Sequence, residues 1–147
     1  GVIDRTDTID DDAFLYALAD ALVLGGLAMA VAGSSRPCSG ADHEILHAID
    51  HLYPGTASHG ELAGLGALFA CHLRGDEELS AHLGACLARH GLPRVPEEAG
   101  LTRDQFAEAV AHAPATRPDR YTILEHLALS AEEVRARVDA FADAVDR

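Results

Sequence analysis

Apolar residues recur along the chain with the three-to-four-residue spacing of amphipathic helices, and no segment alternates with the period of two that marks a strand. Residues typical of helix starts and stops divide this pattern into segments. Together they predict helices over about 12–32, 39–53, 59–74, 76–90, 102–112, 122–127 and 130–145, with Ser39 and Asp42 as a capping pair for the second. The sequence therefore predicts an all-α protein: a multi-helix bundle of about six to seven helices with no sheet.

The most apolar stretch is residues 21–32, interrupted by Gly25 and Gly26. At about a dozen residues it is too short to span a bilayer, and it lacks the basic segment of a signal peptide. Since a helix that is apolar on nearly all sides is normally buried, we expect it to lie in the centre of the bundle. With 147 residues, 48% of them hydrophobic, the chain is expected to form one domain, residues 1–147.

Charge and residue usage exclude several classes of function. Eleven basic residues against twenty-four acidic ones give a net charge of −13, which argues against nucleic acid and membrane surfaces as partners. All eleven basic residues are arginine, so Schiff-base, pyridoxal and P-loop lysine chemistry are excluded in this chain. The three cysteines, Cys38, Cys71 and Cys86, are an odd number with no CxxC pair and predict reduced thiols in a cytoplasmic protein.

Four histidines fall between residues 43 and 59. His43, His47 and His51 are four residues apart, so they lie on one face of a helix. That helix must end near Tyr53, which precedes Pro-Gly, and His59 then begins the next one. The remaining helix histidines have polar neighbours and are expected on helix surfaces: His72, His82 and His90. Two imidazoles from successive helix starts can therefore converge on one point, as the ligands of a divalent metal do.

The segment His43–His47 also matches HExxH, the signature of zinc proteases, in which both histidines bind zinc and the glutamate is the general base. The metzincin extension fails, because Asp50 stands at the glycine position and Tyr53 at that of the third histidine. Glu61 could serve as a downstream carboxylate ligand. Such enzymes bind substrate along a sheet edge, and no strand is predicted here. A zinc hydrolase is thus one alternative function, and a non-catalytic metal-binding or partner domain is another.

A longer pattern extends over residues 14–128. It comprises the apolar helix ending at Gly33, the loop Gly-Ser-Ser-Arg-Pro after it, Ser39-Gly-x-x-His-x-x-x-His47, His59-Gly-Glu61, and residues 116–125, Thr-Arg-Pro-Asp-Arg-Tyr-Thr-Ile-Leu-Glu. With these motifs the chain resembles the helical metal-binding domain of sn-glycerol-1-phosphate dehydrogenases. That family belongs to the iron-containing alcohol dehydrogenase and dehydroquinate synthase superfamily.

The resemblance implies that His43 and His59 bind Zn²⁺ or Fe²⁺, and that His47 faces the substrate and assists proton transfer. It implies NAD(P)-dependent chemistry on a small phosphorylated polyol or ketone, the metal polarising the substrate while a nicotinamide delivers hydride. Arg36 could pair with a substrate phosphate, or only with Asp42 or a helix carbonyl. Glu44 would be an exposed, dispensable residue in this function.

The chain departs from the family pattern in two ways. The family's third ligand is an aspartate in a Gly-Asp-x-x-Ala segment that has no counterpart here, and Asp20, on the apolar helix, is a poor substitute. The nucleotide-binding α/β domain with its glycine-rich loop is also absent, so no residue here is expected to bind NAD(P). The sequence thus predicts the metal- and substrate-binding half of such a dehydrogenase. We expect it to be inactive alone, to bind metal weakly, and to self-associate or require the nucleotide-binding domain or a partner subunit.

Overall fold

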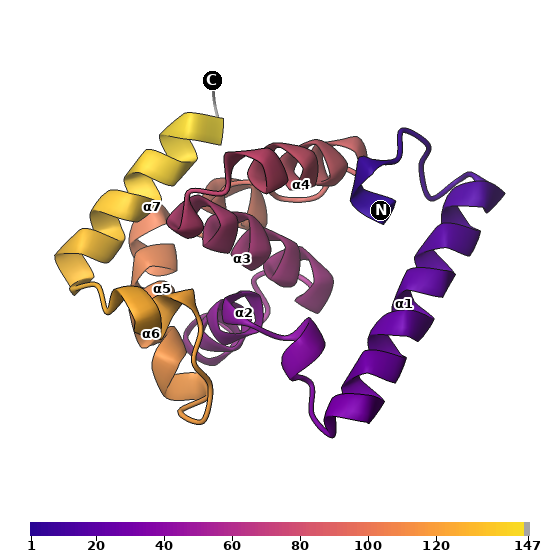
Figure 1. The fold of residues 1–147 in the computed structure, drawn as a ribbon. Coiled ribbons are helices and arrows are strands. Elements are labelled where there is room, and N and C mark those ends of the chain that lie inside the picture. The colour runs from indigo at the N-terminus through magenta and orange to yellow at the C-terminus, as the bar shows by residue number, and fades with distance from the viewer. Residues whose placement is uncertain (146–147) are drawn as a thin grey trace.

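The computed structural model describes residues 1–145, which are helical and contain no strand (Figure 1). The seven α-helices, in chain order, are α1 (Asp12–Ala32), α2 (Ala41–Leu52), α3 (His59–Arg74), α4 (Glu77–Arg89), α5 (Arg103–Thr116), α6 (Ile123–Leu127) and α7 (Ala131–Val145). Three short 3₁₀ turns are interspersed: η1 (Val2–Asp4), η2 (Arg36–Cys38) and η3 (Pro96–Ala99). The predicted all-α architecture is confirmed.

Helices α2 and α3 lie at the centre of the bundle, where α5 packs on α2, α4 on α3, and α7 on α5 (Figure 1). Their shared core contains three phenylalanines, one from each of α3, α5 and α7. The Phe69 ring meets Phe106 at 5.3 Å and Phe141 at 5.2 Å between ring centres, both edge-to-face. This is a favoured geometry for aromatic pairs, and it joins three helices around one side chain.

The closest approach of α2 and α3 depends on Gly66. A Cβ atom at this position would lie 2.8 Å from the carbonyl oxygen of Asp42, a backbone atom of α2. Only glycine therefore allows the two helices to cross at this separation. The contact lies one residue from His43, so it helps to set the position of the predicted metal site.

Local capping chemistry was predictable at several helix starts. The backbone N–H of Gln105 donates to Thr102 Oγ1 at 3.2 Å, and the Gln105 side chain accepts from the Thr102 N–H at 2.9 Å. Glu133 N–H donates to Ser130 Oγ at 3.3 Å in the same manner. Capping boxes are thus present at the starts of α5 and α7.

Two predicted helix ends are wrong. Helix α2 has Gly40 rather than Ser39 as its N-cap, because the Asp42 side chain turns back to accept from the Gly40 N–H at 2.7 Å and Ser39 is buried. Helix α5 continues one turn past its predicted end, to Thr116, with Pro114 in its last turn. A proline that close to a helix end disrupts few of the helix's hydrogen bonds.

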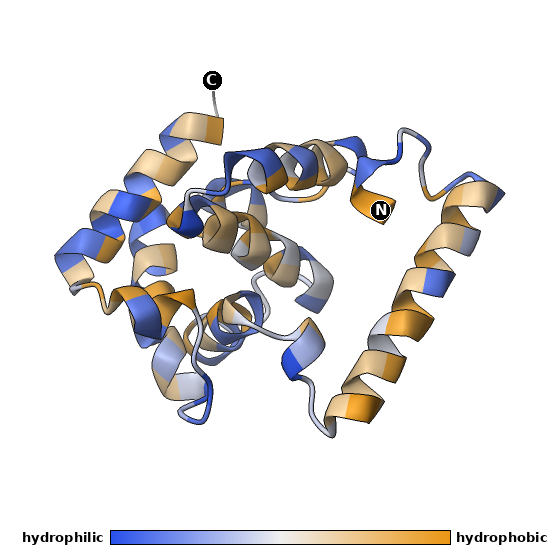
Figure 2. Ribbon diagram, viewed as in Figure 1, coloured by the Kyte–Doolittle hydropathy of each residue, from blue (hydrophilic) through white to orange (hydrophobic). Residues whose placement is uncertain are grey.

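Helix α1 departs most from expectation. Instead of lying in the centre, it stands apart from the bundle and contacts mainly η1 and η2 (Figure 1), and most of its residues are apolar (Figure 2). Phe14 is its one buried residue, whereas its large apolar side chains are exposed: Leu15, Tyr16, Leu22, Val23, Leu24, Leu27 and Val31. The other helices bury their apolar faces against one another and leave α1 no place in their core.

The length of α1 also corrects the expectation that the apolar segment is too short to cross a bilayer. The helix has 21 residues, and by length and composition it could span a membrane. A single helix of this kind is weak evidence for a membrane location, because core helices and signal sequences have the same properties.

Candidate metal centre

Three histidines from two helices meet at one place on the bundle. His43 and His47 lie one turn apart on α2, and His59 is the first residue of α3. The ring centre of His59 is 5.5 Å from that of His43 and 6.2 Å from that of His47, and the two α2 rings are 6.3 Å apart. The fourth histidine of the run, His51, is exposed and stacks on His112 of α5 at 5.5 Å instead.

The geometry of His43 and His59 fits a shared metal ion. A Zn–N bond of about 2.0–2.1 Å in tetrahedral geometry separates the ring centres of two ligands by about 5 Å, close to the 5.5 Å seen here. Asp42 accepts a hydrogen bond from Nδ1 of His43, which leaves Nε2 of that ring with the free lone pair a metal requires. A carboxylate that orients a histidine in this way is a common feature of metal sites.

The other candidate ligands do not complete the site. Glu61 forms a capping box with Ser58, accepting from its backbone N–H at 2.7 Å, and these hydrogen bonds lower the pKa of Glu61. Asp20 is exposed on the separate helix α1, and the Cys38 thiol contacts the Gly25 carbonyl. Among residues 1–145, no group of three or more histidine, cysteine or acidic side chains is arranged to hold a metal. The described residues thus bring together two candidate ligands, His43 and His59, without a third.

His47 differs from its two neighbours because its Nε2 already has a partner. Arg117, in the loop after α5, approaches this atom at 2.6 Å through Nη2. An arginine can only donate, so Nε2 of His47 must be the acceptor and the ring neutral. Burial lowers the pKa of His47, and the nearby charge of Arg117 lowers it further. His47 is therefore held as a neutral base beside the His43–His59 pair.

Glu44 is fully buried, and the expectation of an exposed residue is wrong. One position after His43, it lies about 100° around the helix, on the face that packs against the start of α6. One carboxylate oxygen accepts from Thr122 Oγ1 at 2.9 Å, while the other, Oε1, has no partner. Burial raises the pKa of Glu44. Its position inside the bundle does not suit a general base that must reach metal-bound water.

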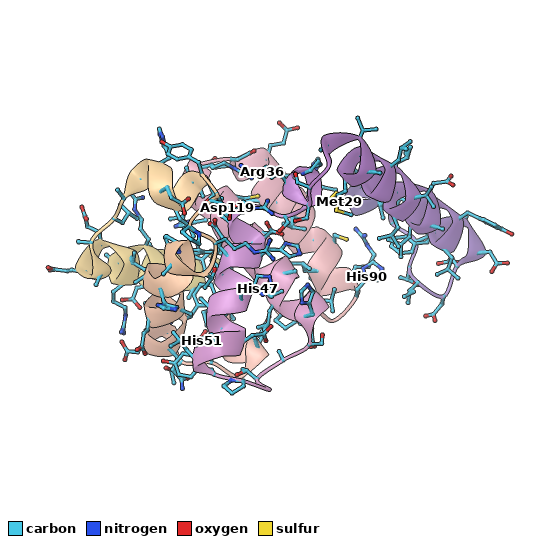
Figure 3. All side chains as sticks on the ribbon, turned by 90° about the horizontal axis from the view of Figure 1, so that it is seen from below. Met29, Arg36, His47, His51, His90 and Asp119 are labelled. Carbon is cyan, nitrogen blue, oxygen red and sulfur yellow. The ribbon has the colours of Figure 1, made fainter. Side chains whose placement is uncertain are left out.

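Arg36 also has a partner different from those expected. Its Nη2 donates to the backbone carbonyl of Asp119 at 2.7 Å and lies 3.5 Å from the carboxylate of the same residue. Both residues are labelled in Figure 3. It pairs with neither Asp42 nor a helix carbonyl. The contact joins the loop before α2 to the loop after α5, more than eighty residues later.

An open hollow of about 760 Å³ lies beside His47, between α2, the end of α5 and the loop that follows. It is lined by His47, His51, His112, Ala115, Thr116, Arg117, Pro118, Asp119 and Arg120. In the sequence, the Arg-Pro-Asp-Arg-Tyr segment of residues 117–121 stands out only as part of a family resemblance. Its two arginines, spaced by three, were the signal that could have identified this surface.

The remaining helix histidines divide into two groups. His82 is exposed, as expected, and pairs with Asp4. His72 and His90 are half-buried, against expectation, and the Nε2 atom of each is buried without a partner. The His72 ring lies 5.5 Å from Phe141 in the aromatic core, and burial lowers its pKa.

Comparison with known proteins finds similarity to a set of glycerol-1-phosphate dehydrogenases, although no protein-family model matches the chain. It is 39% identical over 117 residues to the glycerol-1-phosphate dehydrogenase [NAD(P)+] of Cenarchaeum symbiosum, covering 80% of this chain and 32% of that protein. To the enzyme of the same name from Methanosarcina mazei it is 40% identical over 140 residues, covering 93% and 39%. The corresponding Hyperthermus butylicus protein is 41% identical over 123 residues, covering 82% and 35%.

The chain thus spans about a third of the length of these curated relatives. The similarity that the sequence motifs predict is confirmed: the chain is similar to glycerol-1-phosphate dehydrogenases over the third of their length that it matches.

Proposed function

We propose that the chain is the helical metal- and substrate-binding part of an NAD(P)-dependent dehydrogenase acting on glycerol 1-phosphate or a related polyol phosphate, and that it is inactive by itself. The observation that carries this proposal is the meeting of His43, His47 and His59 at two helix starts, in a chain about 40% identical to such enzymes. A cytoplasmic location, expected from the three reduced cysteines, is part of the proposal.

In this function His43 and His59 would hold Zn²⁺ or Fe²⁺, with Asp42 orienting the His43 ring. When bound, the metal supplies a Lewis acid that polarises the substrate oxygen. His47 would assist proton transfer to or from the substrate once its Nε2 is released from Arg117. Since His47 is not needed as a ligand, metal binding and proton transfer fall to different side chains.

The chain would need two further components to function. A third ligand must come from outside the described residues, because none of those is arranged with the two histidines to complete a site. The nicotinamide nucleotide would be bound by a separate domain or a partner subunit. We therefore expect weak metal binding and no turnover by this chain alone.

Metal content separates the ligand histidines from the others. We expect His43→Ala and His59→Ala each to abolish binding of Zn²⁺ or Fe²⁺, measured by elemental analysis and titration of the purified chain. His51→Ala is the matched control on the same face of α2 and should bind like the parent. Equal metal content in all variants would contradict the assignment of His43 and His59.

The role of His47 needs a different measurement. The variant His47→Ala should keep metal but lose turnover when the chain is combined with the nucleotide-binding part of a relative. Loss of metal in His47→Ala would instead make it a ligand.

A zinc hydrolase has less support, because the glutamate of its motif is buried against Thr122 rather than free to activate water. Peptidase assays on the parent chain and on Glu44→Gln distinguish the two functions. We expect no activity from either. Peptidase activity in the parent that disappears in Glu44→Gln would establish the hydrolase and overturn the dehydrogenase proposal.

A further inference from the structure

Most of the ion pairs among the described residues join an arginine to a carboxylate. Five arginines of the described residues pair with carboxylates within 4 Å: Arg5, Arg36, Arg94, Arg103 and Arg135. No such pair is formed in the described part of the chain by Arg74, Arg89, Arg117, Arg120 and Arg137, although acidic residues outnumber basic ones by twenty-four to eleven. Of these, Arg117 and Arg120 lie next to each other in the fold, where their charges act on the buried Glu44 without forming a salt bridge to it. Their charges are therefore not neutralised by a salt bridge within the bundle.

These two arginines instead use part of their donor capacity on neutral acceptors. Arg117 donates to the His47 ring, and Arg120 donates to the Ser39 carbonyl at 3.0 Å and to Ser35 Oγ at 2.8 Å. These contacts fix the guanidinium groups in place. Because each guanidinium has five N–H donors, Arg117 keeps several available for a ligand.

Both arginines line the hollow beside His47 together with the stacked pair His51 and His112, whose rings are 5.5 Å apart and nearly parallel. Neither ring is ion-paired with a carboxylate of the described residues. Asp119 is the one acidic residue in the wall, and it is held by Arg36. The hollow thus gathers cationic and N–H donor groups on an otherwise acidic protein.

We propose that this hollow is the subsite for the phosphate group of the substrate, a phosphate monoester, with Arg117 as its central contact and Arg120, His51 and His112 around it. The inference rests on the proposed function and names the part of the site that recognises the substrate. Arg–phosphate contacts are charge-assisted and often bidentate, which suits a fixed guanidinium with free N–H groups. Arg36, the residue that the sequence suggested for this role, is occupied by Asp119.

The position of Arg117 relates this subsite to the proposed chemistry. Its Nη2 touches His47, whose ring lies within 6.3 Å of both proposed metal ligands. A phosphate on Arg117 would therefore be separated from the metal site by one side chain. This spacing suits a short substrate that carries its phosphate a few atoms from the reacting carbon.

The test is calorimetric titration of the metal-free chain with inorganic phosphate, glycerol 1-phosphate and glycerol. We expect both phosphate compounds to bind and glycerol not to bind. Arg117→Gln should weaken phosphate binding at least about tenfold, as loss of a charge-assisted contact predicts. Arg117→Lys, which retains the charge, should restore part of it, and the exposed Arg74→Gln is the matched control with unchanged affinity.

Two further variants guard against misfolding and misassignment. His51→Gln changes an exposed side chain and should also weaken phosphate binding, so the proposal does not depend on the folding of Arg117→Gln alone. Arg36→Gln releases the Asp119 carboxylate in the wall and should weaken phosphate binding less than Arg117→Gln does. No binding by the parent chain, equal affinity in Arg117→Gln and the parent, or a loss confined to Arg36→Gln would overturn the proposal.

Failure of this inference is distinguishable from failure of the proposed function. Arg117→Gln should retain metal, because Arg117 contacts neither proposed ligand in the described hydrogen bonds and Thr122 still holds α2 through Glu44. A chain that binds metal through His43 and His59 but binds no phosphate would refute the subsite and leave the metal centre in place.

Discussion

Replacing Gly66 by alanine tests how tightly α2 and α3 are held together. The new Cβ would lie 2.8 Å from the Asp42 carbonyl oxygen, 3.1 Å from its Cα and 3.3 Å from its carbonyl carbon. All three are backbone atoms, so no side-chain rotation relieves the contact. Reaching an ordinary separation of 3.4 Å requires the helices to move apart locally by 0.6 Å.

Two opposing effects set the stability of Gly66→Ala. Overpacking of this kind costs about 1–3 kcal/mol, while replacing a glycine inside a helix gains about 1 kcal/mol. Because the clash is with backbone, we expect the upper part of that cost and a net loss of about 1–2 kcal/mol. For a domain of this size the loss lowers the melting temperature by about 3–6 °C.

Thermal and urea unfolding, followed by circular dichroism, measure this loss. Gly84→Ala in α4 is the control, because its Cβ would lie 3.8 Å from Leu68 Cδ1, an ordinary contact. That variant should gain up to about 1 kcal/mol. If Gly66→Ala were as stable as the parent or more so, the close α2–α3 crossing would be refuted, together with its role in placing His43.

Three further expectations follow from the structure. Because burial lowers the pKa of His72, the unfolded chain takes up a proton more readily than the folded one, so stability should fall below about pH 6.5, and less steeply in His72→Leu. Equal slopes of unfolding free energy between pH 8 and pH 5 in parent and variant would contradict this. The exposed apolar surface of α1 should cause self-association, and light scattering across concentration should show a lower apparent mass for Leu27→Gln with Val31→Gln; a monomeric parent would contradict it. Calorimetry with NAD(H) and NADP(H) should detect no binding, and micromolar binding by a monomer would show that this chain itself carries the nucleotide site.

The sequence predicted helix positions well where the signals are local. Glycine at 75 ends α3, and threonine with glutamine begins α5, because these residues act on backbone groups within one turn. The location of α1 was not predictable in this way. Periodicity reports how apolar each side of a helix is, but which partner covers it is decided by the packing of the whole chain.

The same distinction applies to the candidate site. The meeting of His43 and His59 could be predicted, because the two residues lie near the starts of consecutive helices that a single turn separates. The partners of His47 and Glu44 could not be, because they come from residues 70 and 78 positions later in the chain. Such long-range contacts leave no periodic signal in a single sequence.

The loop between α5 and α6 orients α2, the helix that carries His43 and His47. Arg117, at its start, donates to His47, and Thr122, at its end, donates to Glu44. His47 and Glu44 lie on different sides of α2, so the two contacts together oppose rotation of α2 about its axis. A rotated α2 would carry His43 away from His59. The loop that lines the proposed phosphate subsite therefore also fixes the geometry of the proposed metal centre, which couples recognition of the substrate to the position of the groups that act on it.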